Sequence, residues 1–129
     1  MKTYKILVDD FRQPEDLYYI TRNEIFLEQS WLVVRSYEEF TTYIAEYYRR
    51  GAFPRFISFD YDLGTLQFVR IEQKQEVFVE KNGGHCAQWL AEFVAKNKVA
   101  LPEIYIHSTN EAGKADILDR LAKVMKEKK

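Results

Sequence analysis

The segment that decides the fold is a short apolar run followed at once by two carboxylates, Phe56-Ile57-Ser58-Phe59-Asp60-Tyr61-Asp62. Two other apolar runs also end in polar clusters, Lys5-Ile6-Leu7-Val8 in Asp9-Asp10 and Ile104-Tyr105-Ile106 in His107-Ser108-Thr109-Asn110. Short apolar runs that alternate with helical patterns are typical of parallel strands in an α/β sheet. Because ligands of such sheets bind just beyond the carboxyl ends of the strands, we expect these polar clusters to meet at one rim.

The composition is that of an ordinary soluble globular protein, with 129 residues, 47% hydrophobic residues and a formal net charge of −1. The length predicts a single domain over residues 1–129. The near-neutral charge indicates no extended nucleic-acid surface, and the only cysteine, Cys86, excludes an internal disulfide. No apolar stretch approaches the roughly 18 residues of a membrane span. The N-terminus passes directly into a strand rather than a signal-peptide core, so we expect a cytoplasmic protein.

The predicted elements alternate between strands and helices. Strands are expected at 4–9, 31–35, 56–59 and 103–107. Residues 65–82 are strand-like but polar at their centre, and they are predicted to form a hairpin insertion or, in its functional version, a mobile lid over the rim. This pattern predicts an α/β fold in which a short central parallel sheet is flanked by helices.

Helices are marked less evenly than strands. One begins after Ser36, which is expected to form a capping box with Glu39, and ends at Gly51. Another is predicted at 85–97. The final helix is expected to bury the face that carries Ile117, Leu118, Leu121 and Met125. A turn is expected at 12–16, and an irregular helix or extended cover at 17–29.

Acidic residues at the predicted rim indicate a metal site. Asp9, Asp10 and Asp60 follow two different strands, and alternation along a strand puts Asp9 and Asp10 on opposite faces until the chain turns. Carboxylates held close together raise one another's pKa, which a divalent cation relieves. We therefore expect these three residues to hold Mg²⁺ or Mn²⁺ together with phosphate oxygens of a substrate. The alternative is that each is a solvated strand-end or turn residue.

Four residues are candidates for catalysis. His107 is expected to act as a general acid or base, since imidazole exchanges protons near neutral pH. Asp60 would act beside the metal, Asp62 as a base or as support for the metal ligands, and Ser108 as a phosphate contact. The alternatives are that Ser108 caps the final helix and that His107 packs in the core.

Three more residues are candidates for binding the substrate. Arg12 follows the acidic pair and suits a bidentate phosphate contact. His85 opens a helix after two glycines, and Asn110 precedes the final helix, whose N-terminus offers backbone N–H groups to an anion. In the alternative interpretation Arg12 pairs with a nearby Asp, His85 lies on the surface and Asn110 is a helix cap.

As a set, these motifs resemble the cyclic-phosphate processing receiver-like domains, a family related in fold to the receiver domains of two-component response regulators. The resemblance is carried by Leu7-Val8-Asp9-Asp10-Phe11-Arg12-Gln13-Pro14, Ile57-Ser58-Phe59-Asp60-Tyr61-Asp62-Leu63-Gly64, Gly83-Gly84-His85-Cys86-Ala87-Gln88-Trp89-Leu90 and the segment 101–113. It implies a receiver-like (flavodoxin-like) fold with an acidic site, and it implies a role in processing cyclic phosphates.

Three residues depart from the pattern of that family. Tyr61 lies between two acids where the family has His, His85 replaces an Asp, and Glu111 replaces a Pro. The lost histidine is one that the proposed hydrolysis would use. Because of this departure, a non-catalytic binding module remains an alternative to an enzyme.

The first hypothesis is a metal-dependent phosphoesterase that processes a cyclic phosphate on a phosphate-containing small molecule or nucleotide end. The second is a non-catalytic receiver-like module that binds a ligand or a protein partner. A third, phosphate acceptance on Asp60, follows from the likeness to response-regulator receivers. It is the weaker version because the sequence lacks the fifth strand ending in Lys-Pro that those domains carry.

Overall fold

A parallel sheet forms the centre of the computed structural model, which describes residues 1–64, 67–71, 74–78 and 81–127. Within these residues the sheet has the order β2-β1-β3-β6, and each neighbouring pair of strands is parallel. The strands are β1 (Lys2–Val8), β2 (Trp31–Val34), β3 (Ala52–Phe59) and β6 (Glu103–Ile106). The predicted α/β class is confirmed. The strand order reverses between β1 and β3, which is where ligands bind in doubly wound sheets.

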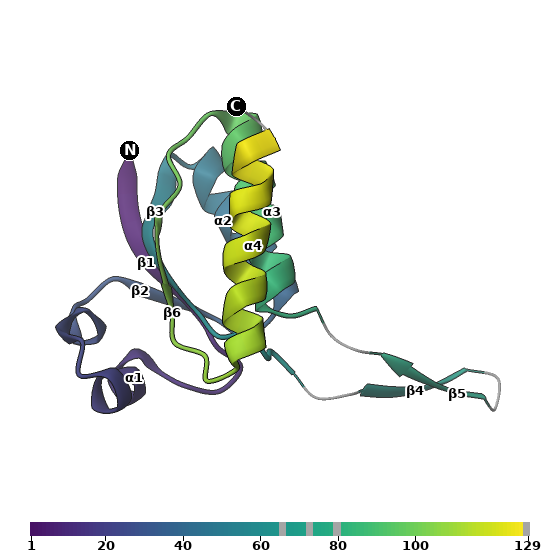
Figure 1. Cartoon of the computed structure of the whole chain (residues 1–129). Coiled ribbons are helices and arrows are strands. Elements are labelled where there is room, and N and C mark those ends of the chain that lie inside the picture. The colour runs from purple at the N-terminus through teal and green to yellow at the C-terminus, as the bar shows by residue number, and fades with distance from the viewer. Residues whose placement is uncertain (65–66, 72–73, 79–80, 128–129) are drawn as a thin grey trace.

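Helices cover both faces of the sheet (Figure 1). One face carries α1 (Pro14–Thr21) and the 3₁₀ helix η1 (Glu24–Leu27). The other carries α2 (Tyr37–Arg49), α3 (Gly83–Asn97) and α4 (Glu111–Glu127). The predicted helices are therefore present. The segment 17–29, for which an irregular helix or extended cover was expected, contains the end of α1 and all of η1.

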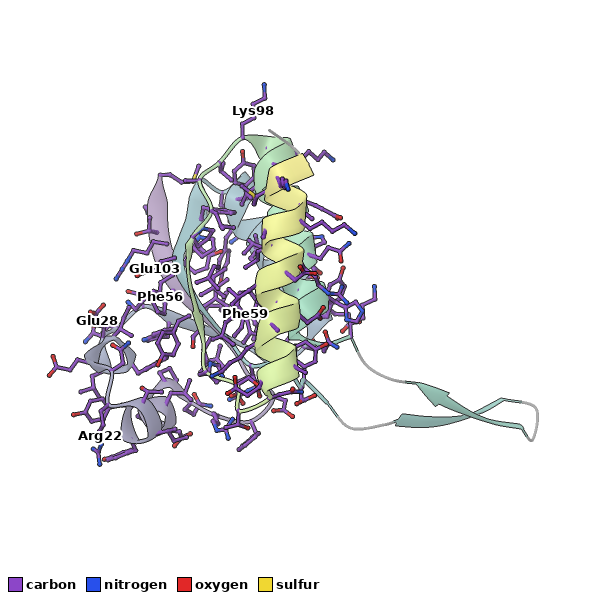
Figure 2. All side chains as sticks on the ribbon, in the orientation of Figure 1. Arg22, Glu28, Phe56, Phe59, Lys98 and Glu103 are labelled. Carbon is purple, nitrogen blue, oxygen red and sulfur yellow. The ribbon has the colours of Figure 1, made fainter. Side chains whose placement is uncertain are left out.

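Side chains alternate between the two faces along each strand. Ile6 and Val8 of β1 belong to the core under α2, α3 and α4, whereas Leu7 packs with the α1 and η1 residues Leu17 and Phe26. Figure 2 shows the same alternation in β3, where the labelled Phe56 and Phe59 lie on opposite sides of the sheet. This alternation continues past the strand ends and decides which rim side chains meet.

Two prolines lie where the sequence interpretation was wrong. Pro14 was assigned to a turn over 12–16, but it is the first residue of α1, a position where its missing N–H costs nothing. Pro54 was expected to precede the third strand, but β3 already begins at Ala52. The register with β1 shifts next to Pro54, and such a bulge lets a sheet accept a residue without an N–H.

The caps and faces of the helices mostly agree with the pattern. Ser36 Oγ accepts the N–H of Glu39, as expected, but the Glu39 carboxylate accepts the N–H of Arg35 rather than that of Ser36. Leu118 was predicted to be buried and is 57% exposed. It follows the buried Ile117 by one residue, which rotates its side chain about 100° around the helix axis, out of the core.

Two further strands, β4 (Gln67–Ile71) and β5 (Lys74–Phe78), pair antiparallel in a separate hairpin that projects from the body of the molecule (Figure 1). They lie in the stretch for which a hairpin was expected. The lid interpretation also involves residues 65–66, 72–73 and 79–80, which lie outside the described residues. In the part of the chain that is described, no helix is both long enough and apolar enough to cross a bilayer.

Candidate functional site

Three side chains from three different strands meet at the rim. Asp9 follows β1, Asp60 follows β3, and His107 follows β6. One donor atom from each lies within 4.8 Å of the other two. All three continue the alternation that faces α1, since Asp9 follows Leu7 and Asp60 follows Ser58 at two-residue spacing. The parallel sheet therefore brings together residues that are up to 98 positions apart in the sequence.

Asp9 is fully buried and its carboxylate has four donors. Oδ1 accepts the N–H groups of Phe11 at 3.0 Å and Arg12 at 2.9 Å, while Oδ2 contacts His107 Nε2 at 2.9 Å and Arg12 Nη1 at 3.3 Å. Burial acts to raise the pKa of Asp9, but the hydrogen bonds from His107 and the two backbone N–H groups outweigh it. The pKa is held well below its ordinary range, so Asp9 is a buried anion.

Asp60 is the second buried carboxylate, and its surroundings act on it differently. Oδ1 accepts the N–H of Tyr61 at 2.8 Å, and Oδ2 lies 3.9 Å from Arg12 Nη1. Burial and the negative charge of Asp9 raise the pKa of Asp60, and the opposing effects of His107 and Arg12 are smaller. Two neighbouring buried acids thus differ in how readily each holds a proton.

His107 has a hydrogen-bond partner on each ring nitrogen. Nε2 lies 2.9 Å from the carboxylate of Asp9, and Nδ1 lies 2.7 Å from the hydroxyl of Ser58 on β3. Because Asp9 is ionised, Nε2 carries the proton, and this N–H donates a hydrogen bond to the carboxylate. Ser58 Oγ donates to Nδ1 when the ring is neutral and accepts from it when the ring is protonated. The imidazole is therefore fixed in orientation in both protonation states.

Two arginines hold the loop between β1 and α1. Arg12 Nη1 lies 3.3 Å from the carboxylate of Asp9 and 3.9 Å from that of Asp60, so one guanidinium charge lies beside both acids. Arg35 Nη1 donates to the carbonyl oxygens of Asp9 at 3.1 Å and Arg12 at 2.6 Å. Neither Arg35 nor Ser58 was singled out from the sequence. Their positions could have pointed to them, because Arg35 directly follows β2, Ser58 lies next to the last residue of β3, and polar residues follow both strands.

Ser108, Asn110 and Asp62 lie at the start of α4. Ser108 Oγ accepts the N–H of Asn110 at 3.1 Å, and Asn110 Oδ1 accepts the N–H of Gly113 at 2.9 Å. The amide of Asn110 donates to Asp62 Oδ2 at 3.4 Å. Asn110 is therefore the cap of α4, whereas Ser108 closes the turn before the helix and does not cap it, and Asn110 also connects Asp62 to that turn.

Asp10 and His85 were also predicted to belong to the site, but neither is part of the cluster of Asp9, Asp60 and His107. Asp10 is exposed, and it lies two residues beyond Val8, the last residue of β1. His85 caps α3, where its Nδ1 accepts the N–H of Asn82, and it lines a separate pocket with Lys81 and Trp89. Burial, followed by the charges of Arg120 and Lys81, lowers the pKa of His85.

Tyr61, which replaces the histidine of the family pattern, is directed towards α4. Its hydroxyl donates to Asp116 Oδ2 at 3.0 Å, and Arg120 Nε holds the same carboxylate at 3.0 Å. The ring covers Gly113 so closely that a Cβ at that position would overlap it. Burial and the bond to Asp116 raise the pKa of Tyr61, so the phenol is neutral. Tyr61 therefore joins the rim to α4.

The donor set of Asp9, Asp60 and His107 makes a possible metal-binding group. Two carboxylate oxygens suit Mg²⁺, while an added imidazole nitrogen is a ligand that Mn²⁺ and other transition metals accept more readily. The residues fit such a cation, because the strand ends place two buried acids side by side. Arg12 and His107 already contact Oδ2 of Asp9, so a cation would compete with them for that oxygen.

A family model agrees with this fold. The model of the cyclic-phosphate processing receiver domain matches residues 4–123. The chain belongs to this family. The match extends from β1 to α4 and includes every strand that contributes to the cluster. No curated protein and no solved structure matches the chain.

Proposed function

We propose that this receiver-like domain is a metal-dependent phosphoesterase that opens cyclic phosphates at the rim of its sheet. One observation carries the proposal, the convergence of Asp9, Asp60 and His107 beside the guanidinium of Arg12. This group of side chains combines ligands for a cation, a group able to transfer protons and a bidentate phosphate donor. Membership in a cyclic-phosphate processing family supports the same substrate class.

The reaction is hydrolysis of a cyclic phosphodiester. Water adds to phosphorus, one ring P–O bond breaks, and the products are a phosphomonoester and a free hydroxyl on the same molecule. A proton leaves the water, and a proton reaches the departing alkoxide oxygen. A bound Mg²⁺ or Mn²⁺ supplies charge neutralisation for the phosphoryl oxygens and lowers the pKa of water.

In this proposal the residues of the chain have distinct roles. Asp9, Asp60 and the exposed Asp10 hold the cation, and Asp10 stays a prediction because it lies outside the buried cluster. Arg12 binds the phosphate by exchanging its contact with Asp9 for one with the substrate. His107 transfers protons, which requires the substrate to replace one of its two partners, Asp9 or Ser58.

The remaining candidates act around the cluster of Asp9, Asp60 and His107. Asp62 is proposed as a base, supported by the amide of Asn110. Ser108 and Asn110 hold the turn before α4 and present its first N–H groups to the phosphate. His85 belongs to the substrate-binding set only if the substrate extends to the start of α3.

The test is turnover of a panel of nucleoside 2′,3′-cyclic phosphates with Mg²⁺ or Mn²⁺. Asp60→Asn removes one buried charge while keeping the shape of the side chain, and we expect a loss of about a hundredfold or more in kcat/KM. Asp119→Asn, an exposed acid on α4, is the matched control and should keep full activity. Equal rates for the wild type and Asp60→Asn would reject the proposal.

Metal binding has its own measurement. We expect Mg²⁺ or Mn²⁺ to raise the melting temperature of the wild type and to have no effect on Asp60→Asn. The Asp10→Asn variant decides whether Asp10 is a ligand, since a lost shift would place it in the site. A flat melting curve of the wild type with both metals would contradict a working metal site.

One observation favours the non-catalytic alternative. The phenol of Tyr61 replaces the expected imidazole and is bonded to Asp116 rather than to the cluster. If this replacement has removed catalysis, the wild type binds cyclic phosphates without turnover, and Tyr61→His gains hydrolysis. Phosphate acceptance on Asp60 predicts a mass gain with acetyl phosphate, which the same samples can reveal.

The cytoplasmic location expected from the sequence stays a prediction.

A further inference from the structure

The side chain of Phe11 is largely exposed to solvent, and its backbone contacts the buried cluster of Asp9, Asp60 and His107. Phe11 is 67% exposed, although it belongs to the short loop that wraps the carboxylate of Asp9. Its backbone N–H donates to Asp9 Oδ1 at 3.0 Å, and this bond fixes the loop relative to the acids. The loop leaves the end of β1 at the rim, where β6 leads into α4 (Figure 1). The exposed ring therefore has a defined place beside the proposed phosphate site.

The ring is coupled to the site by Arg12. The guanidinium carbon of Arg12 lies 4.6 Å from the ring centroid of Phe11, which is cation–π distance. Nη1 of the same group contacts Asp9 at 3.3 Å and lies 3.9 Å from Asp60. The arginine thus lies over one face of the ring, while the residue as a whole is 67% exposed.

Exposure alone does not single out Phe11, because three other large side chains around α1 and η1 are as exposed, Tyr19, Ile20 and Leu27. Phe11 differs from them in its position. It shares a loop and a direct contact with Arg12, the arginine that lies beside both buried acids. A ligand phosphate held by Arg12 would bring its neighbouring groups onto this ring.

We propose that Phe11 is a stacking platform for the base of a nucleotide whose phosphate Arg12 holds. The inference rests on the proposed function and narrows its substrate class to nucleoside phosphates. In a nucleotide the base and the phosphate are one ribose apart, so both can be engaged by adjacent residues of one loop. Stacking uses the π face that all bases share, and the platform accepts purines and pyrimidines alike.

The experiment is calorimetric titration with two ligands that undergo no cyclic-phosphate hydrolysis, adenosine 3′-monophosphate and the base-free ribose 3-phosphate. We expect Phe11→Ala to weaken binding of the adenosine ligand about fivefold to a hundredfold, the range that base stacking contributes. Binding of ribose 3-phosphate should not change. Phe11→Trp should retain or tighten adenosine binding, and Tyr19→Ala is the control for loss of an exposed ring.

The outcomes separate this inference from the proposed function. If Phe11→Ala binds both ligands as the wild type does, the platform is wrong while the phosphoesterase still stands on its turnover assay. If Phe11→Ala weakens both ligands equally, Phe11 shapes the loop and the platform is also wrong. If adenosine 3′-monophosphate binds through Phe11 but cyclic nucleotides are not hydrolysed, the platform stands and the enzyme does not.

Discussion

Asp9 and Asp60 are neighbouring buried carboxylates, but their partners act on them in opposite directions. Asp9 receives two backbone N–H groups and the imidazole of His107, so its charge is satisfied inside the protein. Asp60 receives one backbone N–H and faces the charge of Asp9. The two residues therefore contribute to stability with opposite signs.

We predict that Asp9→Asn lowers the free energy of unfolding in metal-free buffer at neutral pH by about 2 kcal/mol, since hydrogen bonds to a buried charge are lost. Asp60→Asn should leave it unchanged or raise it, because a buried charge that repels Asp9 is removed. Urea denaturation of both variants measures the difference. A loss of stability in Asp60→Asn as large as that in Asp9→Asn would contradict this division.

The same division predicts how stability depends on pH. The pKa of Asp9 is lowered on folding, so its contribution is present above the unfolded value of about 3.9 and is lost as the pH falls towards the folded value. The pKa of Asp60 is raised, so its contribution is favourable below about 3.9 and is lost as the pH rises through the folded value. In metal-free acid titrations, Asp9→Asn should lose less stability between pH 5 and 2, roughly, than the wild type does.

At the scale of single residues, alternation along a strand was the most useful sequence rule. It separates Asp9 from Asp10, and the structure has the first buried and the second exposed. The two-residue spacing also places Ser58 on the face of Asp60, where it reaches His107. The contacts of Arg35 could not be predicted, because they depend on the path of the loop after β1.

At the scale of elements, the N-terminus of α3 is pressed against the backbone of Asp60. The N–H of Gly83 donates to the carbonyl oxygen of Tyr61 at 2.7 Å, and a Cβ on Gly83 would overlap the carbonyl oxygen of Asp60. A Cβ on Gly84 would instead meet side chains, those of Asp116, Asn82 and Arg120. The first glycine is thus required by the rim itself.

We predict that Gly83→Ala destabilises the protein and displaces Asp60, because neither backbone segment can move independently. Gly84→Ala should cost less, since its obstructing side chains can rotate. Alanine is otherwise favoured over glycine within a helix by about 1 kcal/mol. A loss of stability in Gly83→Ala therefore measures the overlap between the added Cβ and the backbone of Asp60. Melting temperatures of both variants provide the test, and equal losses would show that the close approach to Asp60 is not the cause.

The boundaries of elements were harder to predict than their existence. The cap at Ser36 located α2 because its hydrogen bond depends on neighbouring residues only. Pro14 and Pro54 misled the sequence interpretation, since proline is compatible with a turn, with the first position of a helix and with a bulge. Tertiary context selects among these, and it is absent from a local pattern.

At the scale of the whole molecule, parallel topology assembles the site. The adjacent strands β1, β3 and β6 end at one rim, so Asp9, Asp60 and His107 meet although no short motif contains them all. The sequence could predict this meeting from three apolar runs with polar ends. It could not predict that Tyr61 would point to α4, because that choice depends on Asp116 in a distant helix.

The hairpin of β4 and β5 is the largest feature outside this arrangement. Among the described residues, its strands pair with each other in their own sheet and not with the four-stranded sheet, three of whose strands lead into the cluster. The bond between Gly83 and Tyr61 shows that the chain on the two sides of the insertion already meets at the rim. A short connection can therefore replace the hairpin without moving Asp60.

We predict that replacing residues 65–80 with a short Gly-Ser linker changes the free energy of unfolding by less than about 1 kcal/mol, because β1, β3 and β6 remain intact. The metal-induced rise in melting temperature should also persist, since its ligands are outside the insertion. Unfolding of the shortened chain would contradict this prediction. The lid interpretation makes a separate claim, a lower kcat/KM for cyclic nucleotides in the shortened chain. An unchanged kcat/KM, measured on a variant of unchanged stability, would reject the lid and leave the rim residues to exclude water by themselves.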